Sequence, residues 1–239
     1  MRAVLCGANG AMGKLIDGIL GAEIVGRVSI DGENNVPKTF AELGNVDADV
    51  VIDFSHHTAV ADVLAYAKGI GAAAVIGTTG HTPEEKALIT AAAEEIPVFF
   101  SGNMSLGIAV LCRLAKQAAA AFPDADIEIV EAHHIRKVDA PSGTALMLFN
   151  AIKEVRPEAV ANCGRSGEGK RTKEEIGIHA LRMGNVVGIH EIHIHTGNQS
   201  LTLKHESGSR AMLADGACDA ARFMVGKAKG LYSMESMLG

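Results

Sequence analysis

The chain has 239 residues, of which 48% are apolar and 21% charged, and its 22 Lys and Arg against 28 Asp and Glu give a formal charge of −6. This composition provides ample apolar surface to bury and therefore excludes disorder as the main state. The net acidity argues against a nucleic-acid partner, which would need clustered Lys and Arg. No run of about 18 apolar residues is present, so neither a membrane helix nor a membrane partner is expected.

Glycine is frequent, with 27 residues, whereas aromatic residues make up only 4% of the chain and Trp is absent. Many glycines with few aromatics favour tight strand-to-helix turns over a β-sandwich or a protein-binding surface. The cysteines, Cys6, Cys112, Cys163 and Cys218, are too scattered for a C-x-x-C pair. They predict free thiols in a reducing, cytoplasmic location, and the opening apolar run is too short for a signal peptide.

The first hundred residues predict strands that alternate with helices. Nearly continuous apolar strands are expected at residues 2–6, 23–30, 50–54, 73–76 and 97–100, and helices at 10–20, 39–43, 58–68 and 83–95. Apolar strands that alternate with helices are typical of a parallel sheet covered on both faces. This part of the chain is therefore predicted to be a nucleotide-binding α/β unit.

The pattern changes after residue 103. Helices are expected at residues 106–122, 143–155 and 211–227, and strands at 126–132, 178–182, 188–196 and 200–207. The last three strands alternate apolar and polar residues, as a sheet with one solvated or partner-facing side would. The Gly-rich, charged stretch 162–175 is predicted to be a mobile loop. Together these elements indicate a mixed α+β unit.

A glycine turn follows the first strand and has the spacing G-x-x-G-x-x-G, in the segment Gly7, Ala8, Asn9, Gly10, Ala11, Met12 and Gly13. Glycine there permits a tight turn and close approach of a pyrophosphate, while the helix N-terminus attracts the anion. Asp31 ends the second strand, where an acid binds the adenosine ribose hydroxyls and repels a 2′-phosphate. The alternatives are a glycine turn without a ligand and a simple Asp-Gly turn.

Two further turns follow strands, at the sheet edge where open α/β sheets bind ligands. One contains Gly77, Thr78 and Thr79, and the other contains Ser101, Gly102, Asn103 and Met104. Their N–H and hydroxyl groups are candidates to line a nicotinamide pocket, and Asn103 to bond a carboxamide. The alternative for each turn is a purely structural role.

The segment 131–145 carries the densest chemistry. It contains His133, His134, Arg136 and Lys137, followed by Ser142, Gly143 and Thr144, which open a helix. The N–H and hydroxyl groups at such a helix start, with a lysine nearby, would form an anion site suited to a substrate with carboxylates. A lysine and a histidine close together can also supply a proton at neutral pH. The alternative is a solvated basic turn before a capped helix.

Histidines at 190–195 suggest a metal site as a rival use of histidine. On a strand, Glu191, His193 and His195 share one face. However, the sequence has no H-E-x-x-H helix motif and no accompanying acidic cluster, so no metal is predicted.

The order of these segments closely resembles the 4-hydroxy-tetrahydrodipicolinate reductase family, also called dihydrodipicolinate reductase, of the diaminopimelate pathway of lysine biosynthesis. The most specific likeness is EAHHIRKVDAPSGTA at 131–145. The glycine turn and the segments 53–55, 77–80, 103–107, 182–190 and 230–234 follow in the family's order. The resemblance therefore spans essentially the whole chain.

The resemblance implies a Rossmann-like dinucleotide-binding domain at 1–104 and 213–239, and a central α+β domain at 105–212 whose open mixed sheet builds a homotetramer. It also implies hydride transfer from NADH or NADPH to a small cyclic dicarboxylate, with domain closure. By position, His133 is implied to be the proton donor and acceptor, and Lys137 is implied to be its partner acid. The implied substrate contacts are His134, Lys137, Ser142, Gly143 and Thr144.

Two positions depart from the family's pattern. The family often has Arg where this chain has Ala11, and members that prefer NADPH carry a base where this chain has Gly32; the next base after Asp31 is Lys38. Both departures weaken support for a 2′-phosphate, so NADH is expected to serve at least as well as NADPH.

Two other functions are alternatives to the reductase. One is a zinc-dependent hydrolase that uses the 190–195 histidines, and stoichiometric zinc would favour it. The other is a nucleotide-sensing protein without catalysis, against which the presence of both His133 and Lys137 argues.

Overall fold

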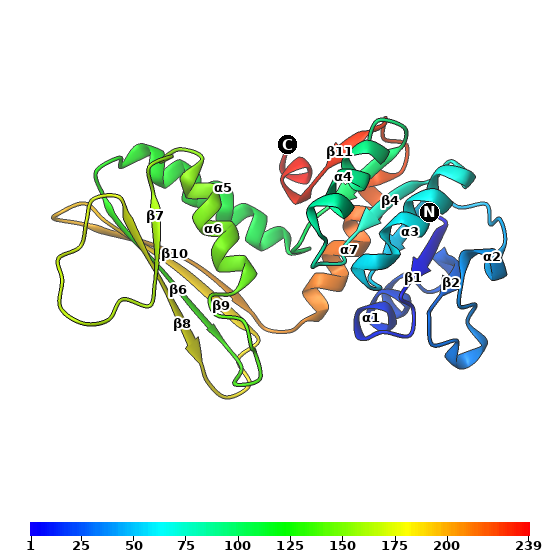
Figure 1. Ribbon diagram of the computed structural model, residues 1–239, viewed down its shortest axis with the longest axis horizontal. Helices are drawn as coiled ribbons and strands as arrows, with labels where there is room; N and C mark the ends of the chain where they lie inside the picture. The colour runs from blue at the N-terminus through cyan, green and yellow to red at the C-terminus, as the bar shows by residue number, and fades with distance from the viewer. The chain divides into compact units, whose positions relative to one another are not determined.

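The computed structural model describes residues 1–239, and the chain divides into two compact units. The first unit contains Met1–Ser105 and Ala211–Gly239, and the second contains Leu106–Arg210. Figure 1 shows the elements of both. The last helix of the chain thus belongs to the same unit as the first strand.

A six-stranded parallel sheet forms the first unit, in the order β11-β5-β4-β3-β1-β2. Its strands are β1 (Ala3–Cys6), β2 (Ile24–Val28), β3 (Val50–Asp53), β4 (Ala73–Ile76), β5 (Pro97–Phe100) and β11 (Gly230–Tyr232). Its helices are α1 (Ala11–Leu20), α2 (Phe40–Leu43), α3 (Val60–Ile70), α4 (Pro83–Ala92) and α7 (Ala211–Met224). Short 3₁₀ turns lie at Gly21–Glu23, Glu33–Asn35, His57–Ala59 and Met234–Leu238. The predicted parallel α/β sheet is confirmed.

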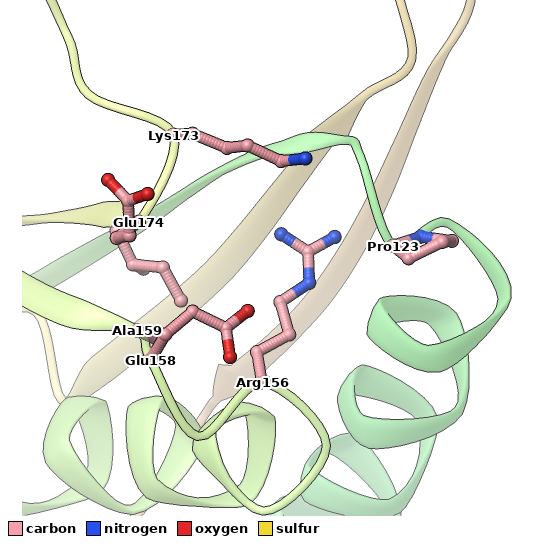
Figure 2. Close-up of a pocket in the computed structure, with 7 residues that line it drawn as sticks. Pro123, Arg156, Glu158, Ala159, Lys173 and Glu174 are labelled. Atoms are coloured by element: carbon pink, nitrogen blue, oxygen red, sulfur yellow. The ribbon is translucent and has the colours of Figure 1, made fainter.

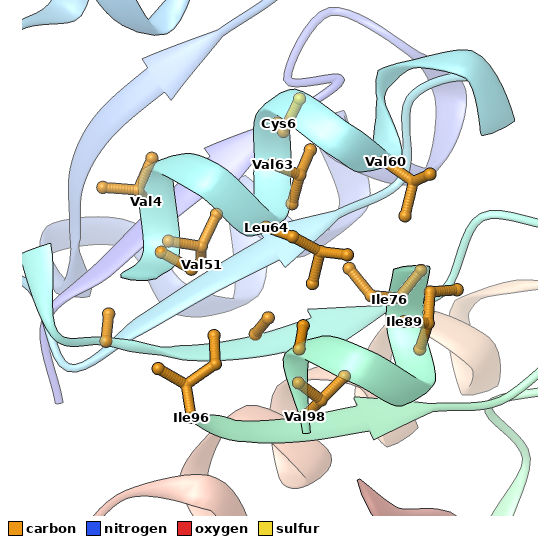
Figure 3. Packing of buried hydrophobic residues seen from close by; sticks show 14 of the residues in the cluster. Val4, Cys6, Val51, Val60, Val63, Leu64, Ile76, Ile89, Ile96 and Val98 are labelled. Carbon is orange, nitrogen blue, oxygen red and sulfur yellow. The ribbon is translucent and has the colours of Figure 1, made fainter. Parts of the chain in front are cut away.

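Helices cover both faces of this sheet because its strands are apolar on both sides. On one face α3 and α4 bury Val63, Leu64 and Ile89 against Val51 and Val98, as Figure 3 shows. On the other face α7 packs against β3, β4, β5 and α1. Helix α4 begins with a capping box, in which Thr82 and Glu85 each accept from the other's backbone N–H.

The second unit is a five-stranded mixed sheet with helices on one face, in the order β10-β9-β6-β8-β7. Its strands are β6 (Asp126–His133), β7 (Val160–Cys163), β8 (Glu175–Arg182), β9 (Gly188–His195) and β10 (Ser200–Ser207), and its helices are α5 (Leu106–Ala121) and α6 (Gly143–Lys153). Strand β9 is antiparallel to β6 and β10, whereas β8 is parallel to β6 and β7. The predicted α+β unit with an open mixed sheet is confirmed.

Two short strands escaped the sequence prediction, and both lie at sheet edges. Strand β7 is half-exposed, with Val160 60% exposed. Asn162 and Cys163, which were predicted to lie in the loop 162–175, belong to this strand. Strand β11 has only three residues, beginning with Gly230. Short edge strands bury little apolar surface, so they carry no clear period-2 signal.

The cysteines are free thiols, and no helix is both long and apolar enough to cross a membrane. Burial raises the pKa of Cys6 to about 12 and that of Cys218 to about 11. Both thiols therefore stay protonated at neutral pH and pack as small apolar groups.

Candidate functional site

The glycine turn between β1 and α1 is closed so tightly that two of its positions exclude a side chain. Gly7 has φ +81°, and a Cβ there would lie 2.4 Å from the carbonyl oxygen of Phe54. A Cβ on Gly13 would lie 2.2 Å from the carbonyl oxygen of Gly7. Helix α1 then starts after Gly10 without a side-chain cap and without an acid in its first turn. The turn therefore presents backbone N–H groups and a positive dipole end to an anion.

Replacing Gly13 with alanine should lower the free energy of unfolding by about 1–3 kcal/mol and weaken NADH binding, because backbone atoms block the new methyl group. Urea unfolding and NADH titration measure the two effects. Gly18→Ala is the matched control, since it lies on the same helix with nothing within 4 Å of its Cβ position. Equal stability and NADH affinity in the two variants would contradict the prediction.

A cavity of about 1110 Å³ opens beside this turn. Of the predicted cofactor residues, Gly7, Gly10 and Asp31 line it. Asn9 Nδ2 and the Glu33 N–H donate to Asp31 Oδ1 at 2.5 and 3.0 Å. The Asn9 hydrogen bond, followed by that from Glu33, lowers the pKa of Asp31, which is therefore a carboxylate at neutral pH.

The same cavity is lined by side chains that the sequence interpretation missed, including Lys38, Phe40 and Tyr66. The rings of Phe40 and Tyr66 stack at 4.4 Å between centroids. Lys38 lies across the backbone of Gly32, where a Cβ would be 2.5 Å from its Cε. A base therefore lies near Asp31 although none follows it directly in sequence. The available signals were the position of Lys38 as the next base after Asp31 and the isolated aromatics in an aromatic-poor chain.

A second cavity of about 410 Å³ gathers residues from both downstream turns. The predicted cofactor residues that line it are Met12, Gly77, Thr78, Thr79, Gly102, Asn103 and Met104. The Thr78 hydroxyl donates to the buried Asp53 carboxylate at 2.7 Å, which ties the ends of β4 and β3 together. The Asn103 side chain accepts from the Ser105 N–H at 2.9 Å. The two turns thus form one surface of the first unit.

Four predicted cofactor residues line neither cavity: Ala8, Asn9, Ala11 and Ser101. Ala8 is buried, and its N–H donates to Val28 at 3.2 Å. The Ser101 hydroxyl donates to the Asn103 carbonyl at 2.7 Å and so shapes the second turn.

In the second unit, Glu131 and His133 project from β6 on the face covered by α6. Strand residues two apart share a face, so both follow the buried Ile127 and Ile129. Glu131 is 0% exposed and His133 is 9% exposed. Their side chains pair, with 2.5 Å between His133 Nδ1 and Glu131 Oε2.

A turn after β6 places Lys137 beside His134. The Lys137 N–H donates to the His134 carbonyl at 3.1 Å, and the Lys137 ammonium lies 2.9 Å from Asp139. His134 Nε2 lies 3.1 Å from the Arg210 guanidinium. Arginine only donates, so this nitrogen accepts and the ring is neutral. Burial, followed by the charges of Arg136 and Arg210, lowers the pKa of His134, which also favours the neutral ring.

Helix α6 begins within this cluster. Ser142 is its N-cap and accepts from the Ala145 N–H at 3.2 Å. Ser142 is itself buried, and its own N–H donates to Glu131 Oε1 at 3.0 Å. Gly143 heads the helix with open space around its Cβ position, and Thr144 follows it. Gly143 and Thr144 therefore lie at the N-terminal, positive end of the α6 dipole, while Ser142 holds the turn.

Glu131, Arg182 and His190 complete the cluster; the sequence interpretation gave Glu131 and Arg182 no role and considered His190 only as one of the 190–195 histidines of the metal alternative. Arg182 donates to both oxygens of Glu131, at 2.8 and 2.9 Å. The His190 ring lies edge-on to that of His133, and burial lowers the pKa of His190 to about 4. The position of Glu131 two residues before His133 on a strand was the available signal; the other two come from different strands.

The cluster is cationic on an acidic protein. Lys137 pairs with Asp139 and Arg182 with Glu131, whereas Arg136 donates to the Asn185 side chain and Arg210 to His134, so two of the four cations have no carboxylate partner among these contacts. Such an arrangement can bind an anion and exchange a proton in one place.

The histidines of β9 do not form a metal centre. No group of three or more His, Cys, Asp or Glu side chains is arranged to hold a metal ion. Glu191 pairs with His193 at 3.2 Å and with Lys204 at 3.3 Å, and His195 bonds Ser200 at 2.9 Å. These side chains are engaged with one another, so they give the hydrolase alternative no site.

A further cavity of about 210 Å³ in the second unit contains none of the predicted site residues. Figure 2 shows Arg156 at its centre, with Pro123, Glu158 and Lys173 around it. The Arg156 guanidinium donates to the carbonyls of Phe122 and Ala125, and Lys173 pairs with Asp124. These contacts hold the end of α5, so the charged residues that line this cavity have a structural role that requires no ligand.

Comparisons with known proteins agree over the whole chain. The family model "Dihydrodipicolinate reductase, N-terminus" matches residues 1–104, and "Dihydrodipicolinate reductase, C-terminus" matches residues 107–238. The 4-hydroxy-tetrahydrodipicolinate reductase of Clostridium tetani is 40% identical and that of Caldanaerobacter subterraneus is 42% identical. Each alignment covers 100% of this chain, with 97% and 98% of the relative.

A solved structure extends this likeness to three dimensions. It is the dipicolinate-bound dihydrodipicolinate reductase from Paenisporosarcina sp. TG-14, with a TM-score of 0.79 and 25% identity. The superposition covers 98% of this chain and 97% of that one.

Proposed function

This chain belongs to the dihydrodipicolinate reductase family, and from that premise we propose that it is the NAD(P)H-dependent reductase that converts 4-hydroxy-tetrahydrodipicolinate to tetrahydrodipicolinate in lysine biosynthesis. The relatives that carry this activity in their names match the whole chain. A solved relative with dipicolinate bound supports a small cyclic dicarboxylate as the substrate.

The observation that carries this proposal is the cationic cluster around His133. A dicarboxylate needs N–H donors and fixed positive charge, and the start of α6 beside Lys137 offers both. We assign substrate binding to His134, Lys137, Gly143 and Thr144, with Ser142 holding the turn from which they act. The Arg210 contact keeps His134 oriented as a neutral hydrogen-bonding group.

The glycine cradle of the first unit fits a nicotinamide dinucleotide. Side chains are excluded at Gly7 and Gly13, which keeps the turn tight and α1 packed closely against it. Gly10, the middle glycine of the motif, lines the adjoining cavity together with the ionised Asp31, so a pyrophosphate can approach the backbone there. When bound, NADH or NADPH supplies the hydride. We assign the Gly7–Met12 turn to the pyrophosphate, and the turns at 77–79 and 101–104 to the nicotinamide side.

His133 and Lys137 are assigned the proton chemistry. The overall conversion takes up a hydride and a proton and releases the 4-hydroxyl group as water. Hydride addition leaves negative charge developing on the substrate, and a positioned acid must quench it. His133 exchanges the proton at Nε2, because Nδ1 is engaged with Glu131. Lys137 stabilises the developing charge through its ammonium group.

The direct test of the proposed function is oxidation of the cofactor at 340 nm, with the substrate generated by the preceding synthase. Absorbance should fall only when synthase product, cofactor and this protein are all present. Omission of the synthase is the control. No oxidation by the full-length protein with fresh synthase product would overturn the assignment.

NADH should give a kcat/KM at least equal to that of NADPH, because the Asp31 carboxylate repels a 2′-phosphate. Lys38 lies in the same cavity and offsets part of this repulsion, so NADPH is also a substrate. Lys38→Ala should therefore lower kcat/KM for NADPH and leave that for NADH nearly unchanged. A strong NADPH preference in the wild type would contradict the proposal.

We also propose a cytoplasmic homotetramer. The face of the second sheet opposite α5 and α6 carries half-buried side chains, among them Val130, Ile189 and Glu191, which neighbouring subunits would cover. Light scattering should give four chains per particle, and a monomer at micromolar concentration would contradict this assembly.

A further inference from the structure

One carboxylate connects the proposed proton donor to the proposed anion-binding helix. Glu131 is 0% exposed and accepts hydrogen bonds at both oxygens. Oε2 receives His133 Nδ1 at 2.5 Å, and Oε1 receives the Ser142 N–H at 3.0 Å. The Arg182 guanidinium spans both oxygens from β8. Ser142 is the N-cap of α6, so this carboxylate contacts both functional parts of the cluster.

We propose that Glu131 is a positioning residue, which sets the tautomer and ring orientation of His133 and simultaneously holds the start of α6 against β6. This inference rests on the proposed roles of His133 and of the α6 N-terminus. It deepens them by naming the group that orders both at once.

The tautomer follows from hydrogen-bond chemistry. An ionised carboxylate only accepts, so His133 must carry a proton on Nδ1. The proton that enters or leaves the ring is therefore the one at Nε2. A Cβ at position 188 would lie 3.2 Å from that nitrogen, so Gly188 leaves space beside Nε2. The ring is thus fixed at one nitrogen, and space remains beside the other.

Arg182 keeps the carboxylate in its accepting state. Burial by itself opposes ionisation of Glu131, yet the hydrogen bonds from Arg182, His133 and the Ser142 N–H together hold its pKa below the usual range. A protonated Glu131 could donate to Nδ1 instead and reverse the tautomer. The two-point Arg182 contact prevents this and also fixes the plane of the carboxylate.

The competing explanation is that Glu131 and Arg182 form an ion pair that only joins β6 to β8. Loss of such a pair would reduce stability, but it would alter neither the kcat of the folded enzyme nor the proton position on His133. Histidine tautomers are read from ¹⁵N chemical shifts, so NMR of the full-length, ¹⁵N-histidine-labelled protein separates the two explanations. The resonances of His133 are assigned by their absence in His133→Asn.

Wild type should show neutral His133 protonated at Nδ1 and unprotonated at Nε2. In Glu131→Gln, the amide can donate to Nδ1 and the proton should move to Nε2. That change should lower kcat about 100-fold or more, with a smaller effect on the substrate KM because the amide oxygen still accepts from Ser142.

Glu128→Gln is the matched control. Glu128 lies on the same strand and contacts His179 Nε2 at 2.8 Å, so the substitution disrupts a Glu–His pair outside the cluster. It should shift only the His179 resonances and leave kcat within about twofold of wild type.

Wild-type kcat in folded Glu131→Gln, or an unchanged His133 tautomer, would overturn the inference. Nδ1 unprotonated in the wild type would overturn it without any variant, which keeps the test decisive should Glu131→Gln fail to fold. Failure of the proposed function is separately visible, because wild type would then not oxidise either cofactor with synthase product. Full activity in His133→Asn would remove the proton role of His133 and this inference with it.

Discussion

Lys137→Ala should lower kcat/KM at least about 100-fold, as expected for loss of a charge clamp or an acid. The ammonium group lies 2.9 Å from Asp139 in the cationic cluster. Its removal deletes the charge that we propose stabilises the developing anion, so kcat should fall. It also leaves the Asp139 carboxylate facing a dicarboxylate substrate without its partner, so KM rises. Steady-state kinetics with synthase-generated substrate separate the two effects.

Two variants control for this result. Lys153→Ala removes a lysine from the last turn of α6, at the opposite end from the cluster, and should leave kcat/KM within about twofold of wild type. Lys137→Ala combined with Asp139→Asn should recover part of the lost substrate affinity, because the unpaired carboxylate is gone. Near-wild-type kcat/KM in Lys137→Ala would refute the role of Lys137.

His133→Asn should lower kcat by about 10²- to 10⁴-fold, the range expected for loss of a general acid. Asparagine is chosen because its amide can still donate to the buried Glu131 carboxylate, which would otherwise lose a partner. Substrate KM should change much less than kcat, because Lys137 and the α6 N-terminus remain. Pre-steady-state measurement of cofactor oxidation reports the chemical step directly.

The matched control for His133 is His179→Asn, which alters a histidine on the adjoining strand β8 that also contacts a glutamate. It should retain wild-type kcat. Both variants should bind NADH as wild type does, because the proposed cofactor residues belong to the first unit. Retention of wild-type kcat by His133→Asn would assign the proton to another group, with Lys137 the first candidate.

The strand-and-helix pattern of the first unit was predictable because its central strands β1, β3 and β4 are buried on both faces. Runs such as Val50–Asp53 and Ala73–Ile76 are fully buried, so apolar composition marked them regardless of their neighbours. The edge strands β7 and β11 lack such an apolar run, because their residues are half-exposed and show no simple alternation of apolar and polar side chains. Their pairing partners, β8 and β5, decided that they are strands.

The candidate site divides in the same way. Contiguous segments, the glycine turn and residues 131–145, were readable because their chemistry is local: a tight turn, an N-cap and a helix start. Residues that enter the site from elsewhere were not. The Lys38 side chain lies over Gly32, the residue after Asp31, and Phe40 stacks on Tyr66 of a different helix. No spacing rule connects such positions, because the packing of separate elements brings them together.

By itself, the sequence determined that this protein has a parallel α/β unit with a glycine turn for a dinucleotide and an α+β unit with a histidine–lysine segment beside a helix start. Hydrophobic periodicity and the steric demands of glycine act over a few residues, so they can be recognised in the amino-acid sequence. The tertiary structure alone decided that Glu131 is fully buried and that Arg182 and Ser142 meet on its two oxygens. A buried carboxylate is tolerated only where donors from several elements converge, and that convergence exists only after β6, β8 and α6 have packed.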